Sequence, residues 1–256
     1  MVRSLYTACT GMVHQMNRLD VVTNNMANSD TTAYKKEGST SQSFDSVYGI
    51  KINDSSVNYI HQNIGRMSLG VKVGETYTDY GDGNLEETEQ LYDMALSGKG
   101  FFAISYADRN GNESVRYTRD GNFTVNSQGV LVTKDGDFVL AEDGGLINIP
   151  EGVKISVDES GRIMADGQEI AQLQLVDFED YNYLKKFGEN MYIAIDGATT
   201  TDAQCKVYQG YLEASNVNVV TEMVDMITIT RDYESNQKVI QTIDSTLEKS
   251  VALGRV

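Results

Sequence analysis

The feature that most constrains this chain is its C-terminal segment, Ser215 to Ser250, which contains neither proline nor glycine. Nothing in it breaks a helix, because those two residues are the strongest helix breakers. Apolar side chains recur every seven positions, at Val219, Met226, Tyr233, Ile240 and Leu247. One flanking line adds Ile229 and Ile243, and the other begins with Met223. A seven-residue apolar repeat of this length is typical of a coiled coil, with Asn216 or Asn218 as the N-cap and Gly254 at the end.

A second amphipathic helix is predicted at the other end of the chain, from Met1 to about Ala27. Two heptad lines run through it, one with Val2, Cys9, Met16 and Thr23, the other with Leu5, Met12, Leu19 and Met26. The opposite face is polar or glycine, as an amphipathic helix requires. Because the C-terminal helix needs a partner, we expect the two terminal helices to pack together.

The apolar surface of the first helix is wider than a single two-helix seam, since Tyr6, Val13, Val21 and Val22 extend it. One interpretation is a single helix pair within one chain. The other is that the additional surface packs against further copies, because a lone pair leaves it in contact with water. The second interpretation predicts an assembly interface made of Val2, Leu5, Cys9, Met12, Met16, Leu19, Met26, Val219, Met223, Met226, Ile229, Tyr233, Ile240, Ile243 and Leu247.

Charge is distributed unevenly along the 256 residues, which carry 37 acidic and 21 basic side chains for a net charge of −16. Residues 1–36 carry +2 and residues 212–256 carry −3, so the middle of the chain holds −15. Phosphate groups repel such a surface, which argues against nucleic acid and anionic lipid as partners.

Two cysteines, Cys9 and Cys205, do not form a disulfide framework. One bond between them is possible, but two separate buried thiols are favoured. No run of 18 apolar residues spans a membrane, and Thr7, Thr10 and His14 interrupt any cleaved signal sequence. The chain is expected to be cytosolic or exported by a route that keeps its first helix.

Between the helices the pattern changes twice, and four regions are predicted: residues 1–36, 37–69, 70–205 and 206–256. Residues 28–36 form a turn, and 37–69 are extended with at most one strand, either a mobile connector or an ordered subunit contact. From residue 70, short alternating segments predict many strands, and Asp-Gly pairs at 82, 120, 135 and 166 predict tight turns. The fold class is therefore α+β, with paired terminal helices and an inserted β sandwich or barrel.

No catalytic, cofactor or metal site is predicted. His14 falls on the polar side of the first helix, and no second His or Cys lies at metal-ligand spacing. Gly98 to Gly100 lacks the spacing of a phosphate loop. Residues 108–113 faintly resemble a calcium loop, but the glutamate at the twelfth position is missing, which favours a plain hairpin turn.

Three stretches resemble the bacterial flagellar rod and hook family. They are SLYTACTGMVHQMNRLDVVTNNMANSDTTAYKK at the N-terminus, GNLEETEQLYDMALSGKGFFAI with YTRDGNFTVNSQGVLVTKDG in the middle, and GYLEASNVNVVTEMVDMITITRDYESNQKVIQTIDSTL at the C-terminus. The positions that carry the terminal signatures are Asn25, Ala27, Asn28, Thr31, Thr32, Tyr34, Lys35, Ser215, Asn216, Val217, Glu222, Arg231, Tyr233, Glu234 and Asn236. One departure is Ala33, where the family usually has glycine, so a left-handed turn there is more costly.

The resemblance implies a structural subunit of the flagellar rod rather than an enzyme, exported unfolded and stacked helically into a hollow shaft. It favours the distal rod over the proximal rod, and the length leaves no room for the extra outer domain of the hook protein. Implied partners are further copies, other rod and hook proteins and the export apparatus, with no small-molecule substrate. Two other hypotheses are an adhesin or glycan-binding β module, which the absence of Trp disfavours, and a hydrolase with paired carboxylates.

Overall fold

The computed structural model describes residues 2–52, 61–108, 113–150 and 152–254. The chain divides into two compact units. The helical unit consists of Met1–Ala27, Glu37–Asp79 and Asn218–Val256, and the β unit of Asn28–Lys36 and Tyr80–Val217. The predicted class is confirmed: two long terminal helices pack together, and the central region consists of several antiparallel sheets.

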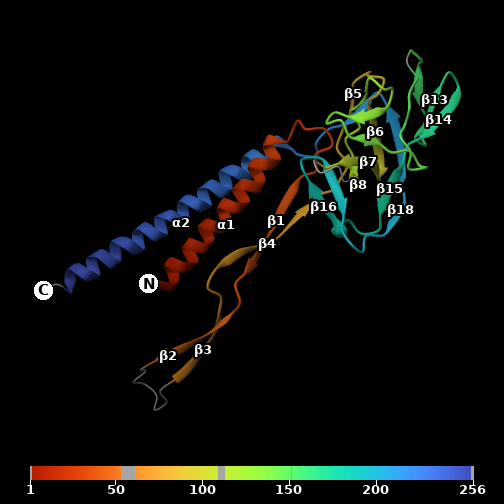
Figure 1. The fold of residues 1–256 in the computed structure, drawn as a ribbon. Coiled ribbons are helices and arrows are strands. Elements are labelled where there is room, and N and C mark those ends of the chain that lie inside the picture. The colour runs from red at the N-terminus through yellow and green to blue at the C-terminus, as the bar shows by residue number, and fades with distance from the viewer. Residues whose placement is uncertain (1, 53–60, 109–112, 151, 255–256) are drawn as a thin grey trace. The chain divides into compact units, whose positions relative to one another are not determined.

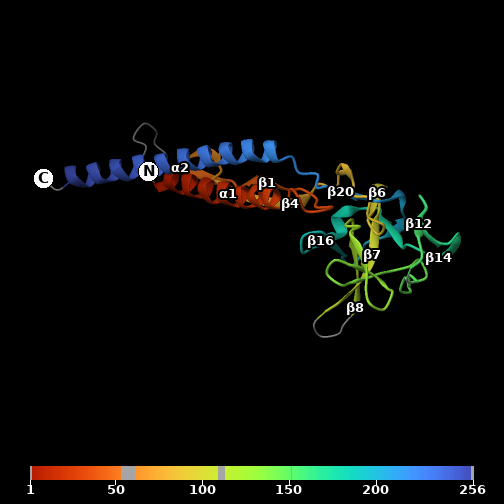
Figure 2. The same cartoon turned by 90° about the horizontal axis from the view of Figure 1, so that it is seen from above.

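The two helices of the helical unit are α1 (Val2–Ala27) and α2 (Val219–Leu253), which lie side by side in both views (Figures 1 and 2). Asn218 is the N-cap of α2, because its side-chain oxygen accepts hydrogen bonds from the amides of Val220 and Thr221. Gly254 follows the last turn as the C-cap. Neither helix is long and apolar enough to cross a membrane within the described residues.

Contacts between the helices show that they are antiparallel. Three contacts set the register: Asn25 with Glu222, Gln15 with Asp232, and Gly11 with Asn236. From one contact to the next, the residue number falls by ten and then four along α1 and rises by ten and then four along α2, so the two helices run in opposite directions. A side chain at Gly11 would come within 3.1 Å of the Asn236 amide, so the glycine leaves room for Asn236 in the seam.

Two strand pairs complete the helical unit. Strands β1 (Glu37–Ser43) and β4 (Val71–Thr78) pair antiparallel and contact α1, and β2 (Val47–Ile52) pairs with β3 (His61–Met67). The prediction of at most one strand in residues 37–69 was therefore wrong; residues 53–60 lie outside the described part. Ser- and Thr-rich strands such as β1 lack the apolar alternation by which strands are recognised. The predicted β region also began ten residues early, because β4 belongs to the helical unit.

The largest sheet of the β unit has the strand order β16-β17-β8-β7-β11-β10-β9, with β15 joining β7 to β18. Its strands are β7 (Phe101–Ala107), β8 (Glu113–Thr118), β9 (Phe123–Val125), β10 (Leu131–Thr133), β11 (Phe138–Val139), β15 (Leu175–Phe178), β16 (Leu184–Phe187), β17 (Met191–Ala194) and β18 (Thr200–Asp202). A 3-10 turn, Tyr181–Tyr183, precedes β16.

Three smaller sheets accompany it in the β unit. They are β12 (Ile155–Val157) with β13 (Arg162–Ala165) and β14 (Gln168–Gln172), β6 (Met94–Lys99) with β19 (Gln204–Gln209), and β5 (Leu85–Glu87) with β20 (Tyr211–Glu213). The main core gathers apolar side chains of the largest sheet, of the β12–β14 sheet and of the β6–β19 pair, and includes the fully buried Phe102, Ile104, Leu131 and Ile163. A second aromatic cluster surrounds Phe101 and Tyr192.

Two of the four Asp-Gly pairs form the predicted tight turns. Gly136 and Gly167 have positive φ in the loops between β10 and β11 and between β13 and β14. The pairs at 82 and 120 do not form such turns. Their glycines instead allow a close backbone approach, because a side chain at Gly83 or Gly121 would collide with the carbonyl oxygen of Ala214 or Met94. The hairpin of β7 and β8 is confirmed by its pairing, whereas residues 109–112, most of the supposed calcium loop, lie outside the described residues.

Candidate assembly surface and buried charge cluster

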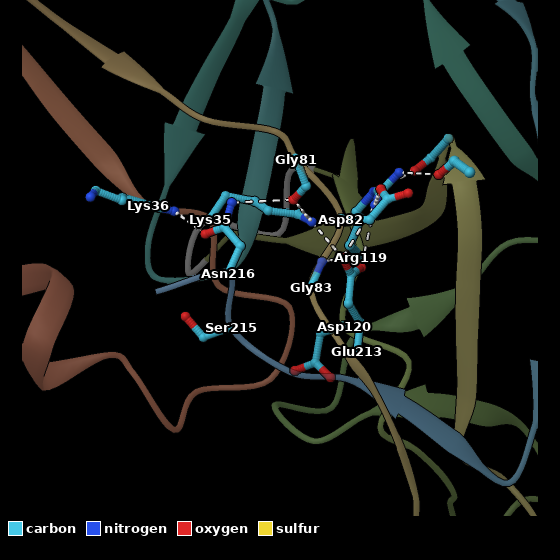
Figure 3. A network of polar contacts seen from close by, with 12 residues as sticks. Lys35, Lys36, Gly81, Asp82, Gly83, Arg119, Asp120, Glu213, Ser215 and Asn216 are labelled. Carbon is cyan, nitrogen blue, oxygen red and sulfur yellow. Dashed lines mark hydrogen bonds and ion pairs between the residues drawn. The ribbon is translucent and has the colours of Figure 1, made fainter. Parts of the chain in front are cut away.

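A buried charge cluster lies in the β unit, where the stretch after α1 meets strand β20. We define it as Lys35, Glu213, Arg119 and Asp82 (Figure 3). The Lys35 ammonium donates to a Glu213 carboxylate oxygen at 2.5 Å and to the carbonyl oxygen of Gly81 at 2.9 Å. Both charged side chains are fully removed from solvent. Burial lowers the pKa of Lys35, and the attraction of Glu213 offsets this only in part.

Arg119 brings the second positive charge to the same carboxylate. Its Nη1 lies 3.3 Å from Glu213 and 2.7 Å from Asp82, whose side chain is 53% exposed. The remaining guanidinium nitrogens donate to the carbonyl oxygens of Gly98 and Gly100. Burial acts against the charged guanidinium, but Glu213 and Asp82 outweigh it and raise the pKa of Arg119. Glu213 is thus the only fully buried carboxylate opposite two buried cations in this cluster.

Further hydrogen bonds join residues 33–36 to residues 213–216 in the β unit. The Asn216 side chain accepts from the amide of Lys36 at 2.7 Å and donates to the carbonyl of Gly81 at 3.2 Å (Figure 3). The amide of Ala33 donates to the carbonyl of Glu213, and the amide of Asn216 to the carbonyl of Tyr34. Positions from both terminal signatures therefore meet here: Tyr34, Lys35 and Asn216.

Other signature positions near this cluster make local contacts in the β unit. The hydroxyl of Thr31 donates to the Asn28 side chain, Thr32 hydrogen-bonds Asp120, and the hydroxyl of Ser215 accepts from the amide of Val217. Sequence reasoning did not single out Glu213 or Arg119, and it considered Asp82 only as part of an Asp-Gly turn. The available signal was a charged residue inside each quoted motif, GYLEASN and YTRDG, but a charge alone does not reveal burial.

Ala33 adopts the left-handed conformation that the sequence marked as costly, with φ +56°, and is buried. We expect Ala33→Gly to change the free energy of unfolding by less than about 1 kcal/mol. Relief of the left-handed strain, about 1 kcal/mol, is balanced by loss of a buried methyl, about 0.8 kcal/mol. Ala33→Val combines a branched side chain at positive φ with overpacking and is expected to cost about 3 kcal/mol. Urea unfolding of both variants measures this, and equal tolerance of the two would contradict it.

In the helical unit, a second motif contact fixes the start of α2. The Asn25 side chain donates to the carbonyl of Glu37 at 2.8 Å and accepts from its amide at 2.9 Å. The same amide nitrogen reaches the Glu222 carboxylate at 3.3 Å. Asn25 and Glu222 are both buried. Glu222 also lies in the first turn of α2, where a negative charge is favoured by the helix dipole.

Burial along α2 shows which heptad lines face α1. Ile229 is buried, and the half-buried apolar positions recur at the same spacing: Val219, Met226, Tyr233, Ile240, Ile243 and Leu247. On α1 the half-buried members of the predicted interface are Leu5, Met12, Leu19 and Met26. These positions are partly or fully shielded from solvent within one chain. Val2 opens α1, and its side chain lies outside the described part.

Three members of the predicted interface remain exposed: Cys9, Met16 and Met223. The prediction of a buried thiol was therefore wrong for Cys9, which lies on the outward face of α1. Cys205 is half-buried, both thiols are free, and burial raises the pKa of the Cys205 thiol. Of the signature residues on α2, Arg231 and Glu234 are exposed and Asn236 is half-buried in the seam; Ala27 ends α1 exposed.

His14 was predicted on a polar face, but it is buried at 5% exposure, and its Nε2 lies 2.8 Å from the hydroxyl of Ser41 on β1. The β1–β4 pair, which the sequence did not reveal, covers this side of α1. Burial, with a smaller contribution from Arg18, lowers the pKa of His14 below its ordinary 6.5.

The lowered pKa of His14 predicts that acid destabilises the helical unit. The folded helical unit buries His14 in its neutral form, so the unfolded chain binds a proton at this residue more readily than the folded chain does. The free energy of unfolding of the helical unit is therefore fully retained above pH 6.5 and decreases as the pH falls from 6.5 through the lower pKa of His14 in the folded state. We expect the loss between pH 7.5 and pH 5.5 to be smaller in His14→Gln, which cannot be protonated. Urea unfolding followed by helical circular dichroism at both pH values measures the difference, and equal losses in the two proteins would contradict it.

No group of three His, Cys, Asp or Glu side chains is placed to hold a metal ion in the part of the chain that the structure describes. The structure instead shows paired terminal helices with apolar side chains on their outward faces, and a β region inserted between them in the sequence. Together these features define a class of α+β proteins whose two chain ends pack together as long helices.

Comparison with known proteins specifies the family. Residues 5–35 match the model described as flagella basal body rod protein, 95–165 the flagellar hook protein FlgE/F/G D1 domain, and 208–253 the flagellar basal body rod FlgEFG protein C-terminal region. The chain is 32% identical to the flagellar basal-body rod protein FlgG of Buchnera aphidicola subsp. Schizaphis graminum, over 97% of this chain and 98% of that protein. Identity to FlgG of Bacillus subtilis is 32% over the full length of both. FlgF of Caulobacter vibrioides is 34% identical, over 98% of this chain and 96% of its own length. The chain belongs to the flagellar basal-body rod protein family, whose members are structural rather than enzymatic.

Proposed function

We propose that this chain is a subunit of the distal flagellar rod and that it polymerises with further copies through the outward faces of α1 and α2. The match to FlgG proteins along the whole chain is the observation that carries the proposal. The exposed apolar side chains support it, because a soluble monomer gains nothing from apolar residues on the outward face of a helix pair.

Fourteen of the fifteen predicted residues, all but Val2, fall into two roles in the proposed interface. Those in the seam, such as Ile229 and Tyr233, hold the helix pair of each subunit together. The exposed members Cys9, Met16 and Met223 contact neighbouring subunits. Methionine suits such contacts, because its flexible side chain adapts to irregular gaps between several neighbours. The paired helices then form the wall of a tube that transmits torque between motor and hook.

The remaining partners follow from this location. Other rod and hook proteins contact the ends of the polymer, and the flagellar export apparatus delivers the chain unfolded, without cleavage of its first helix. No nucleic acid and no small-molecule substrate is required. The net charge of −16 supports the exclusion of phosphate-rich partners.

Two experiments test the proposal. Basal bodies from a strain that lacks this chain are expected to end in a short rod without a hook, as seen by electron microscopy.

Purified full-length chain is expected to sediment as rods, and a version lacking residues 1–27 is expected to stay soluble, because the β unit contains none of those residues. Complete rods in the deletion strain, or rods formed by the shortened chain, would contradict the proposal.

A further inference from the structure

The chain enters the β unit twice, and the first visit is short. Helix α1 ends at Ala27, residues Asn28–Lys36 belong to the β unit, and the chain is back in the helical unit at Glu37, where β1 begins. We call residues 28–36 the anchor segment. Its two ends are joined inside the helical unit, because the side chain of Asn25 donates to the carbonyl of Glu37 and accepts from its amide. The anchor segment is therefore a loop with both ends fixed in the helical unit and its middle folded into the β unit.

Burial distinguishes the anchor segment from an ordinary connection. Its residues form turns and irregular backbone, and such segments usually lie on the surface. Ala33, Tyr34 and Lys35 are nevertheless buried, at no more than 1% exposure. A segment that only linked α1 to β1 would gain nothing from burying a lysine, because a buried charge is costly unless it is paired. The burial of Lys35 therefore indicates that this segment is held by the β unit.

Polar contacts join the Lys35 ammonium to the main core of the β unit. Lys35 pairs with Glu213, and Glu213 pairs with Arg119 (Figure 3). Arg119 in turn donates to the carbonyls of Gly98 and Gly100, where β6 turns into β7. Both strands contribute fully buried side chains to the main core. Lys35 is thus connected through two charged residues to the most deeply buried part of the β unit.

Contacts on either side of Lys35 strengthen the attachment. The ammonium of Lys186 lies 3.9 Å from the centre of the Tyr34 ring, which is a cation–π contact. The amide of Lys36 donates to the side chain of Asn216, just before the N-cap of α2. The anchor segment is thus bonded both to the body of the β unit and to the stretch through which the chain leaves for α2.

We propose that residues 28–36 are a mechanical anchor that couples the helical unit to the β unit, and that the Lys35–Glu213 ion pair is its lock. Two units joined by linkers move relative to each other unless something restrains them. The chain crosses between these units at two other places, Asp79–Tyr80 and Val217–Asn218, and each is a single stretch of backbone. The locked anchor adds an attachment with both of its ends fixed, which restrains the rotation that single linkers allow.

A buried charge pair is suited to act as such a lock. It resists small displacements, because the attraction is strong in a medium of low polarity and water cannot replace a lost partner. In the polymer that we propose, torque applied to the helices reaches the β unit through this lock. The inference rests on the proposed function only for that torque, since the anchor belongs to a single chain.

The spread of distances between the two units tests the anchor by electron paramagnetic resonance. The full-length parent protein carries Cys205→Ser and Asp143→Cys, so one spin label is placed on the natural Cys9 of α1 and the other on an exposed loop of the β unit. The monomer is measured below the concentration at which the chain sediments. We expect a single narrow distribution of distances, because the anchor restrains the units. A broad distribution in the parent protein would overturn the proposal.

Two substitutions in this parent separate the lock from general stability. Lys35→Met removes the lock but leaves Glu213 paired with Arg119, so the β unit keeps its fold. The matched control is Ile163→Val, which removes a buried methyl group from the main core and leaves the anchor segment unchanged. We expect the distribution to become about twofold broader in Lys35→Met and to stay narrow in Ile163→Val. An unchanged width in Lys35→Met, or equal broadening in both variants, would overturn the anchor.

Hydrogen exchange of the same full-length variants tests where the lock acts. We expect the amides of residues 28–36 and 213–217 to exchange about tenfold faster in Lys35→Met than in the parent, while β7 and β10 in the main core keep their protection. Joint opening of two segments far apart in the sequence is what a shared lock predicts. Equal acceleration in the core, or unchanged protection of residues 28–36, would overturn the proposal.

Sedimentation separates this inference from the proposed function. Failure of the unchanged full-length chain to sediment overturns the proposed polymerisation and leaves the anchor standing, because the distances are measured on the monomer. An unchanged width in Lys35→Met overturns the anchor and leaves polymerisation standing.

Discussion

Glu213→Gln is expected to lower the free energy of unfolding of the β unit by about 3–5 kcal/mol, the usual cost of removing one partner from a buried ion pair. Glu213 is fully buried opposite Lys35 and Arg119, and it also accepts from the amide of Gly83 at 2.8 Å. The substitution leaves two buried cations with only the half-exposed Asp82. Urea unfolding followed by tyrosine fluorescence measures the loss.

A second substitution restores the balance of charge. Lys35→Met removes one cation, so the double variant Glu213→Gln with Lys35→Met leaves Arg119 opposite Asp82. We expect the double variant to be more stable than Glu213→Gln alone, which a double-mutant cycle reports as coupling between the two sites. Glu86→Gln is the matched control, because Glu86 is exposed on β5 beside β20. A loss below about 1 kcal/mol in Glu213→Gln, or one equal to that of the control, would contradict the importance of the cluster.

Ile229→Ala is expected to destabilise the helical unit by about 2–4 kcal/mol, while Ile227→Ala changes its stability by less than about 0.5 kcal/mol. Ile229 is 1% exposed within the helix pair, whereas Ile227, two positions earlier, is 52% exposed on the outward face. The same chemical change thus removes a seam contact at one position and only solvent-exposed surface at the other. Thermal unfolding followed by helical circular dichroism measures both.

The two substitutions are expected to rank in the opposite order in their effect on polymerisation, with Ile227→Ala the more harmful. Ile227→Ala weakens the proposed contact between subunits and raises the concentration at which the chain sediments, although the monomer stays as stable as the unchanged chain. Ile229→Ala shows its effect first in monomer unfolding. If Ile227→Ala lowered monomer stability as much as Ile229→Ala, the division of α2 into a seam and an outward face would be wrong.

Local pattern was sufficient to predict the two helices and most of the β region. The seven-residue repeat through Met226 and Ile240 and the capping side chain of Asn218 act over one or two turns of chain, so they are visible in the sequence. The resemblance of both termini to the rod family likewise depends on contiguous residues. The family comparison confirmed it along the whole chain.

The errors share a physical cause, which is contact between distant segments. His14 resembles a polar-face residue until β1 covers it. Strand β1 is polar, and its pairing with β4 depends on backbone hydrogen bonds that leave no apolar pattern in residues 37–43. Cys9 and Leu5 look equivalent on heptad lines, yet Cys9 is exposed and Leu5 is half-buried.

By itself, the sequence determined that the chain ends are long amphipathic helices, that a β region separates them, and that the protein belongs with flagellar rod subunits. Only the tertiary structure decided which flank of each helix faces its partner and which stays outward. Only it revealed that Lys35 and Glu213, 178 residues apart, share a buried charge cluster with Arg119. The reason is that periodicity reports how side chains are arranged around one helix or strand, whereas burial of a charge depends on which distant segment covers it.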